Sequence, residues 1–182
     1  MSKPTVDQIR ALLVCDAATG RLIWKARTPD MFEDDDRPAE WRCRNWNSRY
    51  AGCEAGHLMK DGYRTVRIFD RAYLAHHVIW AIVHGEWPDQ LDHRDGVEVG
   101  DGIGNLRKSS QSENMQNARK RSDNTSGFKG VSWDDLNGKW VARIRVPGGK
   151  YENLGRFDAA EKAHKAYCRR ATELFGQFAR FG

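Results

Sequence analysis

The amino-acid sequence predicts an α+β protein built from small modules rather than one large core. Two observations lead to this expectation: helical spacing of apolar residues is confined to short stretches, and short β-prone runs alternate with turn residues. A chain of 182 residues with 40% hydrophobic residues and seven Trp has enough apolar surface to fold without disulfides. No apolar run approaches the roughly 20 residues of a membrane span.

The first 60 residues predict an N-terminal α/β extension. A Thr-x-x-Gln capping box and apolar residues at helical spacing predict a helix that ends near Val14. A turn and a short strand should occupy residues 16–25. Residues 28–40 hold three consecutive Asp and two Pro, which indicate a solvated loop; an acidic metal site would need a special turn to make them converge. Residues 41–60 show no clear period.

The middle of the chain predicts two strands, a helix and a hairpin. Residues 63–69 and 72–75 are rich in β-prone residues, and residues 76–84 place apolar side chains on one helical face. Residues 91–107 are rich in glycine and indicate a long loop between two short strands. A Ser-x-x-Glu capping box then predicts a helix over residues 111–120.

The last third predicts a three-stranded antiparallel sheet covered on one face by a helix. Alternating apolar residues indicate strands over 128–133, 140–146 and 151–157, and the helix should run from 158 to about 175. Alternation places one row of side chains against the helix and leaves another row facing outward. That outward row comprises Arg143, Arg145, Tyr151 and Asn153, with Lys129 on the matching part of the first strand.

Charge is unevenly distributed about a net value of +5. Residues 61–105 hold four Lys and Arg against eight Asp and Glu, whereas residues 106–182 hold sixteen against eight. We therefore expect the middle to hold a cation and the C-terminal part to hold an anion such as a nucleic-acid phosphate.

The four cysteines form no C-x-x-C pair. Zinc ligation by Cys43, Cys53 and His57 is an alternative, but the favoured interpretation is that the cysteines are reduced thiols in a cytosolic protein. The N-terminus has no signal-peptide pattern, so we expect a cytoplasmic protein.

One pattern of residues indicates a catalytic site. Asp92-His93 lies on an expected strand, Asn105 follows His93 by twelve residues, and Asn114 follows it by twenty-one in the first turn of an expected helix. Each residue alone is more commonly a surface turn or a helix cap. The ordered combination is much rarer by chance, and it resembles the HNH (ββα-metal) nuclease motif of phage homing endonucleases. The residues that carry the resemblance are Ala75-His76-His77-Val-Ile-Trp80, Gly85, Trp87-Pro88, Asp92-His93-Arg-Asp95-Gly96, Asn105-Leu106-Arg107, Glu113-Asn114 and Asn117.

The resemblance implies a role for each residue. His93 would be the general base that takes a proton from water. Asp92 and Asn114 would hold one divalent metal ion, Mg²⁺ or alternatively Mn²⁺, and Asn117 could share the role of Asn114. Because neighbours on a strand face opposite ways, a twist or bulge must bring Asp92 to the metal. Asn105 would pin the loop and orient the His93 ring.

Residues 127–181 resemble an AP2/ERF DNA-binding domain. The matching residues are Gly127 to Trp133, Gly138 to Arg145, Leu154-Gly155, Phe157 to Glu161, Ala166-Tyr167 and Phe178 to Arg180. In that family the sheet lies in the major groove, so the resemblance implies DNA contacts from Lys129, Arg143, Arg145, Tyr151 and Asn153.

The sequence therefore predicts a metal-dependent, phage-type HNH endonuclease of double-stranded DNA that acts as a monomer in the bacterial cytoplasm, without a membrane or small-molecule cofactor. The expected parts are an N-terminal extension (1–60), the HNH domain (61–120), a linker (121–127) and the AP2-like domain (128–182). A non-catalytic DNA-binding regulator with a degenerate HNH domain is the alternative, and an RNA-binding module is a weaker one.

Overall fold

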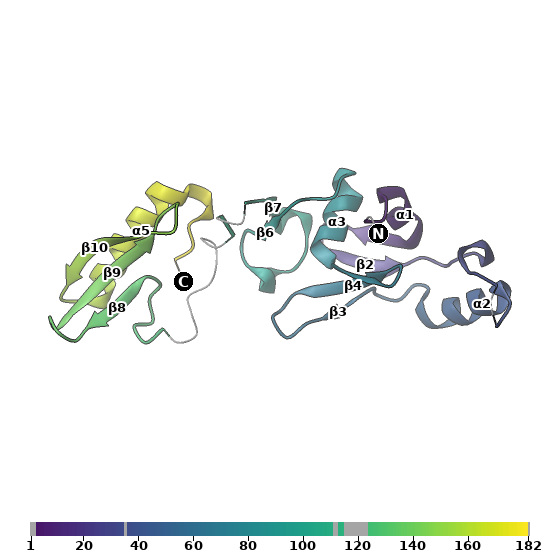
Figure 1. Ribbon diagram of the computed structural model, residues 1–182, viewed down its shortest axis with the longest axis horizontal. Helices are drawn as coiled ribbons and strands as arrows, with labels where there is room; N and C mark the ends of the chain where they lie inside the picture. The colour runs from purple at the N-terminus through teal and green to yellow at the C-terminus, as the bar shows by residue number, and fades with distance from the viewer. Residues whose placement is uncertain (1–2, 35, 111–112, 115–123, 182) are drawn as a thin grey trace. The chain divides into compact units, whose positions relative to one another are not determined.

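The computed structural model describes residues 3–34, 36–110, 113–114 and 124–181. The chain divides into two compact units, residues 1–108 and 109–182 (Figure 1). Both helices and small sheets are present, so the predicted α+β class is confirmed. Among the described residues, no helix is long and apolar enough to span a bilayer.

The first unit opens with helix α1 (Val6–Leu12) and a hairpin of strands β1 (Leu13–Asp16) and β2 (Arg21–Trp24). The predicted capping box is present, with Thr5 and Gln8 bonded reciprocally. The expected helix end near Val14 is wrong, because the chain becomes extended at Leu13, whose side chain is 2% exposed. Burying Leu13 while pairing it with Trp24 of β2 favours the strand.

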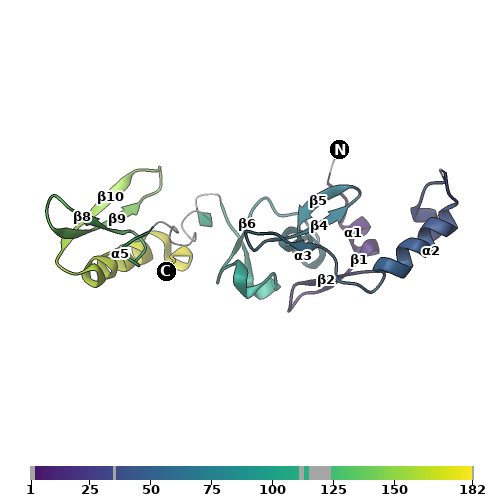
Figure 2. The same ribbon diagram turned by 90° about the horizontal axis from the view of Figure 1, so that it is seen from below.

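A second helix, α2 (Ala39–Tyr50), occupies a region for which the sequence predicts no element. It lies at one end of the first unit, away from α3 (Ala75–His84), in both views (Figures 1 and 2). Only Ala39 and Cys43 of α2 are buried, so it has no continuous apolar stripe.

The core of the first unit lies between a small sheet and α3. Strands β3 (His57–Leu58), β4 (Arg64–Ile68) and β5 (Arg71–Leu74) are antiparallel neighbours in that order. The two main strands and α3 match the predicted ranges within one or two residues. Four residues of α3 are fully buried in the core that α1 also joins: Ala75, Val78, Ile79 and Ala81.

Two short strands, β6 (Leu91–His93) and β7 (Leu106–Lys108), end the first unit as an antiparallel pair. Residues 94–105 connect them, and we call this segment the site loop. It contains two 3-10 turns, Val97–Val99 and Ile103–Asn105. The predicted long loop between short strands is thus confirmed.

The second unit contains strands β8 (Val131–Asp134), β9 (Lys139–Arg145) and β10 (Tyr151–Phe157) in the order β10-β9-β8. Helix α5 (Ala160–Phe175) covers one face of this antiparallel sheet (Figures 1 and 2). The predicted strands and helix are present, although β8 begins at Val131 rather than Phe128. Ala142 and Ile144 pack toward the helix, as alternation predicts.

Candidate active site

The β6–β7 hairpin presents Asp92 and His93 to opposite faces. The register pairs Asp92 with Arg107 and His93 with Leu106, and it is regular along both strands. Side chains alternate along a strand, so the two residues point away from each other. The expected bulge that would bring them to one side does not occur in β6 or β7.

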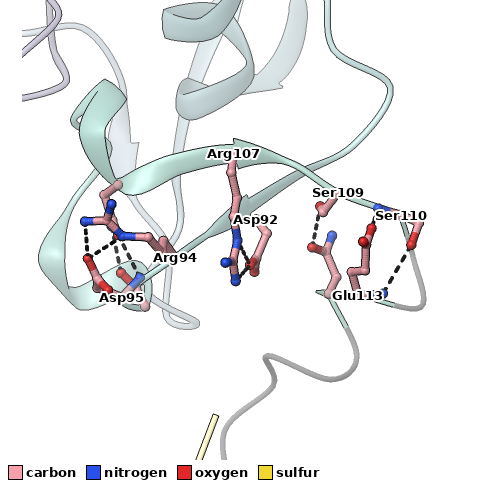
Figure 3. Close-up of polar contacts among 10 residues, drawn as sticks. Asp92, Arg94, Asp95, Arg107, Ser109, Ser110 and Glu113 are labelled. Atoms are coloured by element: carbon pink, nitrogen blue, oxygen red, sulfur yellow. Dashed lines mark hydrogen bonds and ion pairs between the residues drawn. The ribbon is translucent and has the colours of Figure 1, made fainter. Parts of the chain in front are cut away.

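Asp92 forms a buried ion pair with Arg107 (Figure 3). Its Oδ2 atom accepts hydrogen bonds from Nε of Arg107 at 2.9 Å and from Nη2 at 2.6 Å. The side chains are only 9% and 13% exposed, so the guanidinium balances a carboxylate that would otherwise be costly to bury.

His93 lies on the other face and is 5% exposed. Its Nε2 atom is 2.8 Å from Oδ1 of Asp101, a buried carboxylate of the site loop. The ring packs edge-on against His76, with centroids 4.7 Å apart, and against Tyr63 at 5.7 Å. These contacts fix the plane of the imidazole.

Asn105 ties the site loop together with three hydrogen bonds. Its Oδ1 atom accepts from the backbone N–H of Asp95 at 2.8 Å, and its Nδ2 atom donates to the carbonyls of Gly96 at 3.0 Å and Gly100 at 2.8 Å. Asn105 is 6% exposed, so these bonds lie away from bulk water. The side chain thus closes the loop on itself.

A compact group of three buried side chains, His76, His93 and Asp101, has ligand atoms within 4.8 Å of one another. It is the only such group of His, Cys, Asp and Glu in the described part of the chain, and it includes none of the cysteines. Two imidazoles and a carboxylate suit Zn²⁺ or another transition metal better than Mg²⁺. The two residues expected to hold Mg²⁺ through oxygen atoms, Asp92 and Asn114, are not members of this group.

His76 is a neutral member of this group. Burial, with smaller contributions from His93 and His77, lowers its pKa to about 3. Its Nδ1 atom is buried without a hydrogen-bond partner among the described residues. His76 therefore adds no positive charge beside His93 near neutral pH.

Asn114 belongs to the second unit, so its position relative to Asp92 is a prediction. Its Oδ1 atom accepts a hydrogen bond of 2.6 Å from the Ser109 hydroxyl. The predicted capping box is present: Glu113 accepts from the N–H of Ser110, and Ser110 Oγ accepts from the N–H of Glu113 (Figure 3). Glu113 and Asn114 are helical, but the rest of the expected 111–120 helix, including Asn117, lies outside the described residues, as do residues 121–123 of the expected linker.

The second unit presents a polar sheet face opposite α5. The register pairs Tyr151 with Arg145 and Asn153 with Arg143, so these four side chains share that face. All four are exposed. Val141 lies in the same row but is 1% exposed, so the face is not uniformly polar.

Lys129 lies before β8 rather than on it. Burial, with a smaller contribution from Arg180, lowers the pKa of Lys129 to about 8. This half-buried ammonium thus differs from the exposed arginines of β9 in its surroundings.

Comparison of the sequence with known proteins identifies a family for this chain. An HNH endonuclease family model matches residues 73–116, which include Asp92, His93, Asn105 and Asn114. Protein 3.8 of Escherichia phage T7 is 34% identical over 125 residues, which cover 68% of this chain and 99% of the phage protein. The chain belongs to the Protein 3.8 family. No solved structure matches significantly.

This member of the Protein 3.8 family has three site residues to which the sequence pattern gave no catalytic role. Arg107 and His76 are part of the motif without an assigned role, and Asp101 lies in a glycine-rich loop. The arrangement explains why: Asp101 meets His93 only after the site loop folds back, a long-range contact that has no local periodicity.

Proposed function

We propose that this protein is a metal-dependent DNA endonuclease that hydrolyses phosphodiester bonds through its HNH domain. The HNH family match over residues 73–116 is the observation that carries the proposal. The local structure around the predicted residues supports it. Asp92 and His93 lie on a paired strand, Asn105 is hydrogen-bonded within the closed site loop, and Asn114 follows the capped turn at Ser110.

His93 is the proposed general base. An imidazole held rigidly by packing and a hydrogen bond is suited, in its neutral form, to accept a proton from an attacking water. Asn105 is the proposed organiser of the loop from which Asp101 reaches this ring.

The proposed metal ligands are the Asp92 carboxylate and the Asn114 amide oxygen. Both are hard oxygen donors, so their chemistry fits Mg²⁺ or Mn²⁺, which take few protein ligands and keep several waters. A bound cation would neutralise phosphate charge and stabilise the leaving oxygen. Arg107 already balances Asp92, so metal binding requires the carboxylate to share or release this guanidinium.

The proposed DNA-holding part is the C-terminal module, interpreted as AP2-like. Its sheet face carries Arg143 and Arg145 beside Tyr151 and Asn153, residue types that contact phosphates and base edges. In this proposal the C-terminal module holds double-stranded DNA and the HNH domain cuts it. The protein would act in the host cytoplasm as a monomeric endonuclease of the phage homing type.

The test is cleavage of end-labelled duplex DNA with Mg²⁺ or Mn²⁺, against EDTA, read on a denaturing gel that resolves both strands. His93→Ala should abolish cleavage, since a general base contributes roughly 10²–10⁴-fold, while DNA affinity stays nearly unchanged. His57→Ala is the control, because His57 is exposed. Equal cleavage by folded His93→Ala and wild type would refute the assignment.

A DNA-binding regulator with an inactive HNH domain is the second candidate. The buried Asp92–Arg107 pair favours it, because the guanidinium already satisfies the proposed metal ligand. DNA binding without cleavage at any divalent-metal concentration, together with no metal binding by wild type, would favour the regulator.

A further inference from the structure

The site loop rests on the turn between β1 and β2 through contacts that only glycine allows. A Cβ atom at Gly20 would lie 2.3 Å from the carbonyl carbon of Asp101, and one at Gly102 would lie 2.3 Å from the carbonyl oxygen of Ala18. The backbone N–H of Ile103 also donates to the carbonyl of Ala17 at 2.8 Å. These contacts place the backbone of Asp101 against the N-terminal hairpin.

The turn that receives the loop is itself held by Asp16. Its Oδ1 atom accepts from the backbone N–H groups of Ala18 at 3.0 Å and Thr19 at 3.3 Å, and its Oδ2 atom accepts from the Thr19 hydroxyl at 2.7 Å. Asn105 fixes the loop from within. Asp101 is therefore positioned from both sides before any DNA binds.

The carboxylate of Asp101 meets one particular nitrogen of His93. A carboxylate near neutral pH only accepts hydrogen bonds, so the Nε2 atom, 2.8 Å away, must carry the proton. In a neutral imidazole the lone pair then resides on Nδ1. Burial of both partners, at 5% and 9% exposure, keeps water from competing for this contact.

We propose that Asp101 is the positioning residue for His93: it holds the imidazole as the Nε2-protonated tautomer, so that Nδ1 is the nitrogen that accepts the proton from water. In that step the water O–H bond breaks, a bond from the proton to Nδ1 forms, and the resulting imidazolium donates from Nε2 to the Asp101 carboxylate. Neutral His76, packed on the same ring, adds no repulsion to this imidazolium. The proposal rests on the proposed nuclease function, yet its first test does not need activity.

The first test is two-bond ¹H–¹⁵N correlation NMR of the full-length, ¹⁵N-labelled protein without divalent metal. The His93 ring signals are identified by their absence in His93→Gln. We expect a pyrrole-type Nε2 and a pyridine-type Nδ1 in wild type and in the control Asp95→Asn, whose carboxylate is exposed. In Asp101→Asn, whose amide can either accept or donate, both tautomers should appear. A pyrrole-type Nδ1 in wild type, or unchanged signals in Asp101→Asn, would overturn the proposal.

The second test is kinetic. Asp101→Asn should lower kcat for duplex cleavage at least tenfold, and by no more than the roughly 10⁴-fold that a general base supplies, while KM is unchanged. A purely structural role would instead lower the folded fraction and leave the kcat of folded protein as in wild type, which would overturn the proposal. Absence of cleavage by wild type would refute the nuclease function, and the NMR result would still decide the pairing.

Discussion

Replacing Asn105 should destabilise the first unit by about 3 kcal/mol. Asn105→Ala removes three hydrogen bonds of 2.8, 3.0 and 2.8 Å from a side chain that is 6% exposed. Each such bond contributes about 1 kcal/mol net, and the backbone groups left behind are only partly able to find water. Asn105→Asp should be at least as harmful, because an oxygen would then face the carbonyls of Gly96 and Gly100.

The assay is urea unfolding followed by tryptophan fluorescence, combined with hydrogen exchange at the Asp95 amide, whose acceptor is lost in Asn105→Ala. Asn137→Ala is the control, since its exposed side chain makes one hydrogen bond of 2.9 Å to Asp134 and should contribute little. A loss below about 1 kcal/mol in Asn105→Ala, with the Asp95 amide still protected, would refute the view that Asn105 organises the loop.

Three further predictions concern Gly20, His76 and Arg143. Gly20→Ala should lower the free energy of unfolding by about 1–2 kcal/mol because of the positive φ, and by more because the added Cβ meets the site loop. Gly52→Ala has a similar φ of +80°, but no described atom beyond its chain neighbours lies within 4 Å of the added Cβ, so urea titrations should show only the first loss. Because the pKa of His76 is about 3 when folded and about 6.5 when unfolded, the unfolded state binds more protons between these values. Unfolding free energy should therefore fall as pH drops below 6.5, by up to about 1.4 kcal/mol per pH unit, and His76→Phe should flatten this dependence; an unchanged slope would contradict the assignment. Arg143→Ala should reduce the salt slope of DNA binding by about 1, whereas Lys165→Ala, an exposed change on α5, should leave it unaltered; equal effects would argue against the sheet face.

Local signals predicted most of the secondary structure. Capping boxes at Thr5 and Ser110 are present, because such pairs satisfy backbone groups within one turn. The strands of the C-terminal sheet follow from alternation of apolar and polar residues, with buried Val141 as an exception in the outward row. Helix α2 could not be predicted this way, since it buries little and is anchored by particular contacts instead. Trp46 lies edge-on to Trp24, and the Arg27 guanidinium lies 3.9 Å from the Trp46 ring centroid.

The candidate site was predictable in part. Spacing and resemblance identified Asp92, His93, Asn105 and Asn114, and the family match contains all four. The partners Arg107 and Asp101 depend on strand register and loop docking, which spacing alone does not reveal. Gly102, which suggests a free loop, is in fact required by the close approach of its backbone to the carbonyl of Ala18.

Docking of the site loop on the β1–β2 turn has a consequence for the exchange of the HNH segment between proteins. The segment that the HNH model matches, residues 73–116, does not contain the surface that shapes its own loop, since Ala17, Ala18 and Gly20 lie outside it. A chimaera that transplants only this segment would carry His93 and Asp101 without the turn that holds them together. Recombination that preserves this arrangement of His93 and Asp101 must therefore carry the N-terminal hairpin along with the motif.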